Sequence, residues 1–546
     1  MLAVALGVLV VLVMLLTSGQ MAELRVALPP LSEALSWLDR VPGPFDMYHV
    51  VFFALIAAGL RVILPAVSGW ALLALLGVLA VGTELLQFAT VGRTPKLLDV
   101  RDDMIGAGIG LLLGSLPLWL AGRAPGLQRV GDAALLAGLA LLPLQLWAVW
   151  SAFGFPLQAS DLLFLLALGL RGFAWATGVA PMRIGGIHGW LGAYVLAMGL
   201  AVLVLVPSGD AAPAPDFVCA MPPPKYLAAV GKWIGVAWLA VIAGLAFDAA
   251  TRQGGPRRLI LSWLAGAAVA GMASWLAITA FYLGGGTGWW DMFLSHYGSL
   301  PPGPYPRVRG LFANANMAGL YLLLSIGLAL AAYAAGWLAR RTLGLLLALL
   351  CVALLATASQ AIGAAILLLA GWGFQAGRSS KVARAALMGL GSTAALGILG
   401  LLLINPAAPL VLPSVRMQLW QQAWFAWQGA FWRGNGLGQP PAGLAFLAPD
   451  GNMQYLTDAH NIVLSLGAQG GILAVAAFLG LVAWIAWQAR HVAWLAAAQV
   501  ALLLAVGYLG IGGAFEDARV LWVFMGLLAG AIITRDAPAA PRACAP

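Results

Sequence analysis

Long apolar stretches separated by short polar segments run along the whole chain. A helix needs about 20 mainly apolar residues to cross the hydrocarbon core of a bilayer. About sixteen stretches approach that length, and they occupy residues 2–17, 48–65, 69–89, 103–121, 133–152, 161–178, 187–206, 226–247, 259–283, 311–336, 343–357, 360–376, 386–405, 461–487, 491–511 and 519–534. The pattern predicts an all-α, polytopic bundle of transmembrane helices. We expect the first stretch to be an anchor, because it lacks a basic leading region and a convincing cleavage site of a signal peptide.

Composition supports a membrane protein and excludes other classes. Of 546 residues, 62% are apolar and 9% are charged, whereas soluble domains have about 45–50% and about 25%. The mean hydropathy is +0.95, which indicates more apolar surface than the core of a folded protein could bury. Soluble enzymes, nucleic-acid binders and disordered proteins are therefore excluded. The net charge of +9 is explained by arginine-rich loops on one side of the bilayer rather than by a nucleic-acid partner.

The distribution of charged residues predicts how the chain is oriented in the membrane. With the N-terminus inside, sixteen of the 28 Lys and Arg residues fall in inside loops, whereas only Asp132, Asp248 and Asp536 of the 19 acidic residues do so. This asymmetry follows the positive-inside rule. We therefore expect both termini to be cytoplasmic.

Two long loops and one short polar segment separate parts of the predicted helix bundle. The loops at 283–310 and 406–460 lie outside, and the second contains a partly helical segment around VRMQLWQQAWFAWQGAFW. Their aromatic residues suit an interfacial belt or a sugar-stacking surface. The polar segment near 122–132 separates a four-span unit, residues 1–125, from a larger unit, residues 133–536.

Polar side chains gather at the predicted outer ends of the larger unit: Arg307, Arg309, Asn314, Asn316, Arg416, His460 and Asn461. Guanidinium groups bind phosphate oxygens in a bidentate manner, and a histidine can take the proton of an attacking hydroxyl. Such a set suits transfer from a diphosphate-linked donor. The alternatives are interfacial anchoring for the arginines and helix capping for the histidine. Lys232 could contact a lipid phosphate or extend to the interface.

Four segments give the larger unit a resemblance to a family. RVRGLFANANMAG, TASQA, RMQLWQQAW followed by GNGLG, and DAHNIVLSLGAQGGILA occur in the order found in O-antigen ligases and Wzy-type polymerases, which this region resembles. The resemblance implies a bacterial inner-membrane glycosyltransferase with its active face in the periplasm. It implies transfer of a polyprenyl-diphosphate-linked glycan to a hydroxyl of lipid A core, of a growing glycan or of a protein, without a cofactor or metal.

The same resemblance implies roles for individual residues. Arg309 and Arg416 would hold the diphosphate, and His460 would be the base. Two residues depart from the family pattern. Gln360 occupies a position where the family usually has arginine, and Ala315 occupies one where it often has proline. Further candidates for contacts with the substrate are Asn316, Asn461 and Lys232.

The first unit contains its own polar residues near the predicted outer face. Asp46 and His49 precede or begin one span, and a cluster follows around one hairpin: Glu84, Gln87, Arg93, Asp99 and Asp103. Glu84 and Gln87 share a helix face because they are three residues apart. One interpretation is a buried polar network that holds four helices together. The pattern resembles the VanZ-like family, which implies an interaction with lipid or glycan at the outer leaflet.

Two rival functions remain open. A transporter or flippase of lipid-linked glycan would also have many spans, but such proteins commonly have internal repeats and broken helices, and the sequence predicts neither. The other is a non-catalytic partner of an envelope polysaccharide machine, which the glutamine at position 360 favours slightly.

Overall fold

The structure is a computed structural model of the chain. It describes residues 46–64, 67–87, 97–120, 124–145, 148–152, 155–178, 181–203, 226–252, 254–283, 292–295, 307–375, 415–447, 453–513 and 518–534. The stretches predicted at 2–17 and 386–405, Arg93, and most of the 283–310 loop lie outside these residues. The chain divides into two compact units, one of residues 1–131 with 168–182 and the other of residues 132–167 with 183–546.

The first unit is built on helices α4 (Met47–Ile63), α5 (Gly69–Gln87) and α6 (Leu97–Leu120). Three glycines, one per turn of α6, allow this helix to pack directly on the backbone of α4. A Cβ atom at Gly106, Gly110 or Gly114 would collide with Val50, Ala54 or Ala58, respectively. Small residues at this spacing let membrane helices approach closely. Each successive glycine of α6 meets a residue four positions further along α4. The two helices therefore run parallel, and their N-termini meet.

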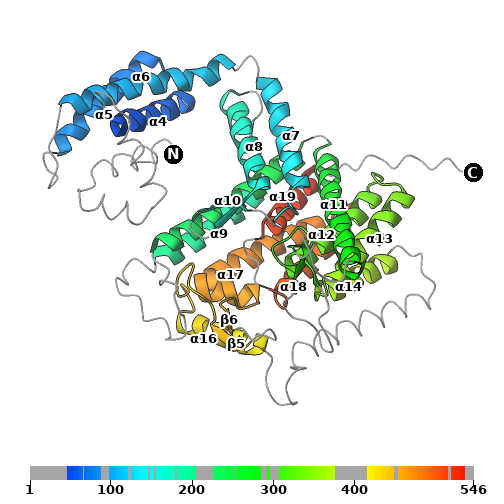
Figure 1. Cartoon of the computed structure of the whole chain (residues 1–546). Coiled ribbons are helices and arrows are strands. Elements are labelled where there is room, and N and C mark those ends of the chain that lie inside the picture. The colour runs from blue at the N-terminus through cyan, green and yellow to red at the C-terminus, as the bar shows by residue number, and fades with distance from the viewer. Residues whose placement is uncertain are drawn as a thin grey trace, which may run out of the picture. The chain divides into compact units, whose positions relative to one another are not determined.

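The second unit contains most of the remaining helices. They are α9 (Gly186–Leu203), α10 (Tyr226–Ala250), α11 (Gly255–Leu283), α12 (Ala315–Ala334), α13 (Arg340–Ala356), α14 (Ala361–Gln375), α16 (Val415–Gly429), α17 (Ile462–Ala489), α18 (Ala496–Leu509) and α19 (Arg519–Thr534) (Figure 1). Helices α7 (Ala124–Ala140) and α8 (Ala159–Ala176) have residues in both units. The prediction of a predominantly helical fold is confirmed.

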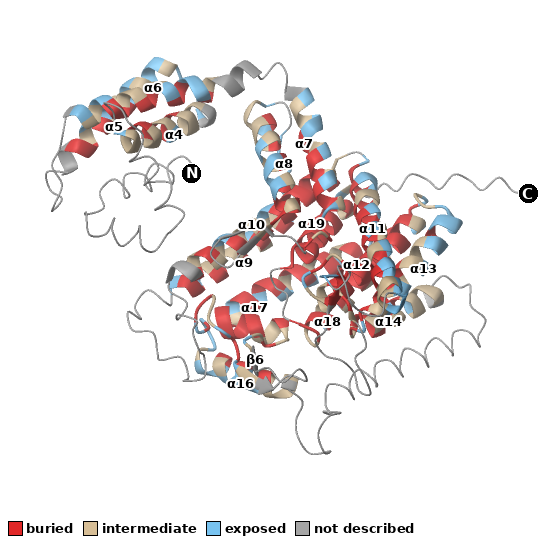
Figure 2. Ribbon diagram, viewed as in Figure 1, coloured by how far each residue is buried: buried red, intermediate tan, exposed pale blue. Residues whose placement is uncertain are grey.

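The second unit has its core around α12 and α19, which are buried along most of their length (Figure 2). A buried ion pair lies in this core, because Arg519 Nε is 2.7 and 2.8 Å from the carboxylate oxygens of Asp161. The indole of Trp238 donates to the same carboxylate at 3.0 Å. These three residues connect α8, α10 and α19.

The described helices support a membrane protein. Six of them are long and apolar enough to cross a bilayer: Ala159–Ala176, Gly186–Leu203, Ala229–Ala250, Gly255–Leu283, Ala315–Ala334 and Ile462–Ala489. Large apolar side chains are exposed on the helices of both units, including Val78, Leu112, Leu276 and Leu345. Exposed apolar surface of this extent suits contact with lipid. The larger number of spans and the membrane topology remain predictions.

Among the described residues, three pairs of short strands interrupt the helical pattern. Strand β1 (Ala148–Ala152) pairs with β2 (Phe155–Gln158), β3 (Leu294–Ser295) with β4 (Arg307–Val308), and β5 (Leu444–Leu447) with β6 (Met453–Leu456), all antiparallel. The prediction of one continuous span over 133–152 is therefore wrong. Helix α7 ends at Ala140, just before Pro143, and the chain continues into β1. Proline lacks the amide hydrogen that a helix interior requires.

Helix α17 is broken, contrary to the prediction of unbroken spans. Gly471 has φ 67° and ψ −168° in its interior. The glycine-rich loop that follows α16 fills the break: Asn435 N–H donates to Ala468 O at 2.8 Å, and Gly436 N–H donates to Gln469 O at 3.1 Å. On the other side of the break, Ile472 N–H donates to Phe431 O at 2.9 Å. The backbone groups freed by the break are therefore bonded by the chain itself.

Candidate functional site

Arg307 lies on β4, just before α12, and its guanidinium connects two neighbouring segments. Its Nε donates to the carbonyl oxygen of Thr357 at 3.0 Å, in the turn between α13 and α14. Its Nη2 donates to Oδ1 of Asn316 at 2.8 Å, in the first turn of α12. Among the described residues Nη1 makes no hydrogen bond. An arginine has five N–H donors, so this guanidinium retains donors for a ligand.

Arg416 lies in the first turn of α16 and reaches the same α13–α14 turn. Its Nη1 donates to the carbonyl oxygen of Ile511, at the end of α18, at 2.9 Å. With the Gln360 amide turned so that its oxygen faces the guanidinium, Oε1 accepts from Nη1 at 2.5 Å and from Nη2 at 3.0 Å. Gln360 therefore orients the Arg416 guanidinium, whereas the arginine expected at this position would have added a positive charge.

Arg307 and Arg416 form a positive pair without a counter-charge among the described residues. Within the part of the chain that the structure describes, no carboxylate lies within ion-pair distance of either guanidinium. Burial lowers the pKa of both, and the charge of Arg307 lowers the pKa of Arg416 further. Arginine nevertheless stays charged in proteins. Because buried charges are normally paired, the arrangement is suited to an anion.

Hydrogen bonds of Asn316 and Tyr508 connect the segments next to this arginine pair. The Asn316 side chain accepts from Arg307 through Oδ1 and donates through Nδ2 to the carbonyl oxygen of Gly512 at 3.0 Å. The Tyr508 hydroxyl donates to the backbone oxygen of Asn316 at 3.1 Å. The beginning of α12 is thus fixed to the end of α18, and Asn316 positions Arg307.

His460 lies in the turn that precedes α17. Its Nδ1 is 3.3 Å from Oδ2 of Asp458, and its backbone N–H donates to Oδ1 of the same residue at 3.0 Å. The neighbouring residue, Ala459, packs with Leu419 of α16 in one apolar cluster. A proton held on Nδ1 by Asp458 leaves Nε2 as the basic nitrogen. The turn that carries this half-buried imidazole therefore packs beside α16, the helix whose first turn contains Arg416.

Two turns of this region have a strained backbone. Among the described residues other than glycine, only Ala358 and His460 have positive φ, at 45° and 50°. Positive φ is uncommon for residues with a Cβ atom, and strained residues concentrate at functional sites. Ala358 belongs to the turn that receives both arginines, and His460 is the expected base.

The structure gives the other expected site residues of this unit different surroundings. Arg309 donates to backbone oxygens only, from Nε to Met292 at 2.8 Å and from Nη1 to Ala313 at 3.4 Å. Asn461 caps α17, since its Oδ1 accepts from two backbone amides. Lys232 donates to Oε1 of Gln469 at 2.9 Å, beside the break in α17. None of these contacts joins the residue to Arg307 or Arg416.

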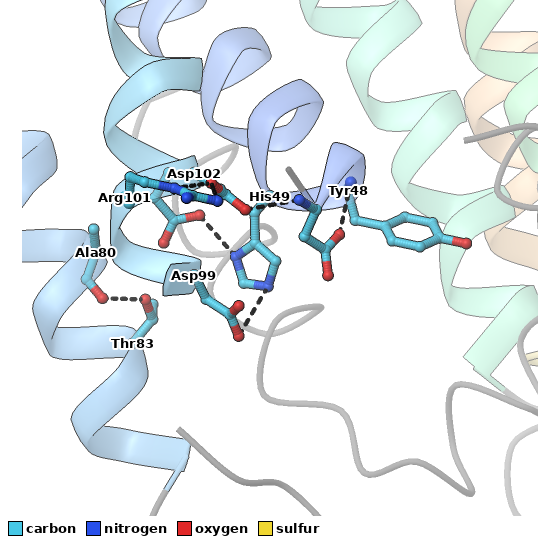
Figure 3. Close-up of polar contacts among 9 residues, drawn as sticks. Tyr48, His49, Ala80, Thr83, Asp99, Arg101 and Asp102 are labelled. Atoms are coloured by element: carbon cyan, nitrogen blue, oxygen red, sulfur yellow. Dashed lines mark hydrogen bonds and ion pairs between the residues drawn. The ribbon is translucent and has the colours of Figure 1, made fainter. Parts of the chain in front are cut away.

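The first unit brings several of its predicted polar residues together where α4 and α6 begin (Figure 3). Nδ1 of His49 is 2.8 Å from Oδ1 of Asp103, and Nε2 is 3.8 Å from Oδ2 of Asp99. Glu84 is buried near the end of α5, close enough for its charge to act on Asp103. Gln87 is the last residue of α5, and Arg93 lies outside the described residues.

The structure adds three features that the sequence did not assign to the larger site. Arg307, rather than Arg309, reaches the α13–α14 turn. Gln360 orients Arg416 although it replaces an expected arginine. The indole nitrogen of Trp420, one turn after Arg416, is buried without a hydrogen-bond partner among the described residues. An arginine followed by a tryptophan four positions later on a helix was the available signal.

Comparison with protein-family models, with curated proteins and with solved structures finds no match for this chain. The two family resemblances therefore remain predictions from the sequence. The function has to be argued from the geometry of the sites themselves.

Proposed function

We propose that the chain is a membrane glycosyltransferase that ligates or polymerises glycans carried on a polyprenyl diphosphate. The proposal rests above all on the positive pair of Arg307 and Arg416. These residues come from distant segments, they are largely buried, and no carboxylate of the described residues neutralises them. A diphosphate supplies the charge and the oxygen acceptors that two guanidinium groups require.

The reaction would be a direct displacement at the anomeric carbon. The acceptor hydroxyl oxygen forms a bond to this carbon, and the bond from this carbon to the phosphate oxygen breaks. The leaving lipid diphosphate takes the bonding electron pair, and its charge is stabilised by Arg307 and Arg416. Nε2 of His460 takes the proton of the acceptor hydroxyl. Displacement in one step predicts inversion of configuration at the anomeric carbon.

Neighbouring residues would position these groups. Gln360 and the carbonyl of Ile511 fix the Arg416 guanidinium, and Asn316 fixes that of Arg307. Asp458 holds the His460 imidazole in the tautomer that a base needs. Such preorganised donors are worth more in a site that excludes water than on an open surface.

One observation favours a transporter, the rival function. Broken helices line the substrate sites of many transporters, and α17 is broken at Gly471. Here, however, the freed carbonyls of Ala468 and Gln469 accept from the loop at Asn435 and Gly436. A break that is filled by the chain's own backbone offers few groups to a cargo. This geometry supports a structural role for the break and leaves the enzyme as the better proposal.

The test compares the glycans of cells that lack the protein with those of cells complemented by wild type or by His460→Ala at equal protein level. Long polymer retained on the lipid carrier identifies a ligase, and single repeats without long chains identify a polymerase. The proposal predicts that His460→Ala fails to restore the normal profile. Full restoration by this variant would remove His460 as the base, and an unchanged profile in the deletion strain would contradict the proposed function.

A further inference from the structure

We propose that the first unit binds a divalent metal ion between Asp46, His49 and Asp99. Each of the three side chains offers one ligand atom, and these atoms lie within 4.8 Å of one another. The site is separate from the arginine pair of the second unit, and it does not depend on the proposed function. The sequence predicted no metal site.

Parallel packing of α4 and α6 brings these residues together. The glycine contacts described above fix the register, so that the start of α4 meets the first turn of α6. A hydrogen bond of 2.7 Å from Asp46 N–H to Oδ2 of Asp102 joins the two ends directly. The cluster is therefore built on two helix ends whose relative position is set by backbone contact, and rigid elements hold ligands well.

The His49 imidazole is oriented as in metal sites. Asp103 lies 2.8 Å from Nδ1, and an ionised carboxylate only accepts hydrogen bonds. In a neutral His49 the proton would then lie on Nδ1, and Nε2, which faces the side where Asp99 lies (Figure 3), would be free to bind a metal ion. Histidine ligands commonly donate their second nitrogen to a carboxylate in this way, which fixes the tautomer and raises the basicity of the ligating atom.

One carboxylate oxygen next to His49 is left without a partner among the described residues. Asp103 is fully buried, and its Oδ2 has no hydrogen-bond partner among the described residues. The carboxylates of Glu84 and Asp99 both act on it electrostatically. Arg101 is paired with Asp102 at 2.8 Å. A dication next to His49 would add positive charge beside the buried carboxylate of Asp103.

The ligand set indicates the class of metal. One imidazole nitrogen with carboxylate oxygens suits first-row divalent ions such as Zn²⁺ and Mn²⁺, whereas Ca²⁺ and Mg²⁺ favour oxygen ligands alone. Asp46 caps α4 through Oδ1, which accepts from Tyr48 N–H at 3.0 Å. No hydrogen bond among the described residues uses its other oxygen. Three protein ligands leave at least one coordination position for water or for another oxygen ligand.

The competing explanation is an internal ion pair, in which a protonated His49 lies between Asp103 and Asp99. The separation of 3.8 Å between Nε2 and Asp99 is longer than a hydrogen bond. Metal binding and an internal ion pair make opposite predictions for a stripped protein to which metal is returned.

The experiment uses the full-length protein, purified in detergent and stripped with a chelator. Zn²⁺ is titrated by calorimetry, and Mn²⁺ is titrated with detection by electron paramagnetic resonance. We expect one ion per chain, and a loss of affinity of at least about tenfold in Asp103→Asn, because outer carboxylates commonly contribute about 10–100-fold. His49→Ala and Asp99→Asn should bind less tightly still.

His491→Ala provides a matched control, because His491 is an exposed histidine of the second unit, and this variant should bind as wild type does. Gel filtration establishes that each variant is folded. Should His49→Ala aggregate, the nearly isosteric Asp99→Asn decides the question. The proposal is overturned if the stripped wild type binds no stoichiometric ion, or if Asp99→Asn binds with unchanged affinity.

Discussion

With its amide turned toward the guanidinium, the oxygen of Gln360 accepts from both terminal nitrogens of Arg416, at 2.5 and 3.0 Å. A neutral partner fixes the direction of the guanidinium and leaves its full charge for a ligand. An acidic residue in this place would form an ion pair and compete with a diphosphate.

We therefore predict that Gln360→Glu lowers glycan transfer by at least about tenfold, since a bidentate carboxylate satisfies the donors that the substrate needs. Gln360→Met, which keeps the length but removes the hydrogen bonds, should lose only a few-fold. Transfer is measured as release of polyprenyl diphosphate from a lipid-linked oligosaccharide. Equal activity of Gln360→Glu and wild type would mean that Arg416 does not bind the donor.

A comparison of Arg307 with Arg309 tests which arginine joins Arg416. Arg307→Lys keeps the charge but loses the fork of donors, and we expect transfer to fall by about 10²-fold, as for the loss of one preorganised donor. Arg309→Lys should change transfer by less than about fivefold, because this residue contacts backbone oxygens only. Both variants are assayed at equal protein level. The reverse order of effects would return the role to Arg309.

The strained turn at Ala358 predicts an increase in stability. With φ at 45°, replacement by glycine removes a steric cost of about 1–2 kcal/mol. Ala358→Gly should therefore raise the unfolding temperature in detergent. Ala353→Gly, inside α13, is the matched control and should lower it, because glycine costs about 1 kcal/mol in a helix interior. An unchanged or lower temperature for Ala358→Gly would show that the backbone is not strained there.

The buried pair of Asp161 and Arg519 predicts a non-additive effect on stability. Arg519→Met leaves a carboxylate buried without its partner, which costs about 3–5 kcal/mol. The double variant with Asp161→Asn should recover a large part of this loss, because no charge then remains. Thermal unfolding of the single and double variants forms the cycle. Simple addition of the two losses would show that the residues do not act as a pair.

Much of the helical framework follows from the sequence alone, because bilayer-length apolar runs require helices. The prediction at 461–487 corresponds to α17 at Ile462–Ala489, and that at 519–534 to α19. Hydropathy does not distinguish a helix from a strand in a short apolar segment, which explains the error at 133–152. The hydropathy pattern also does not reveal the break at Gly471, since glycines are frequent in membrane helices.

The candidate sites depend on contacts that linear patterns do not contain. Arg307 and Arg309 are two residues apart in an arginine-rich segment, and only the position of β4 decides which one reaches the α13–α14 turn. The metal cluster requires that α4 and α6 run parallel. The glycines of α6 are the signal for that packing, and their spacing could have been read from the sequence.

In the proposed enzyme, Arg307 and Arg416 together bind a lipid diphosphate. The most direct measurement is equilibrium binding of polyprenyl diphosphate to the purified protein, with polyprenyl alcohol as the control ligand. It requires neither the sugar nor the acceptor to be known. We expect wild type to prefer the diphosphate, and Arg307→Gln with Arg416→Gln to weaken this binding by at least about 100-fold, equal to about 2.7 kcal/mol. Equal affinity of wild type and the double variant would contradict this role of the two arginines.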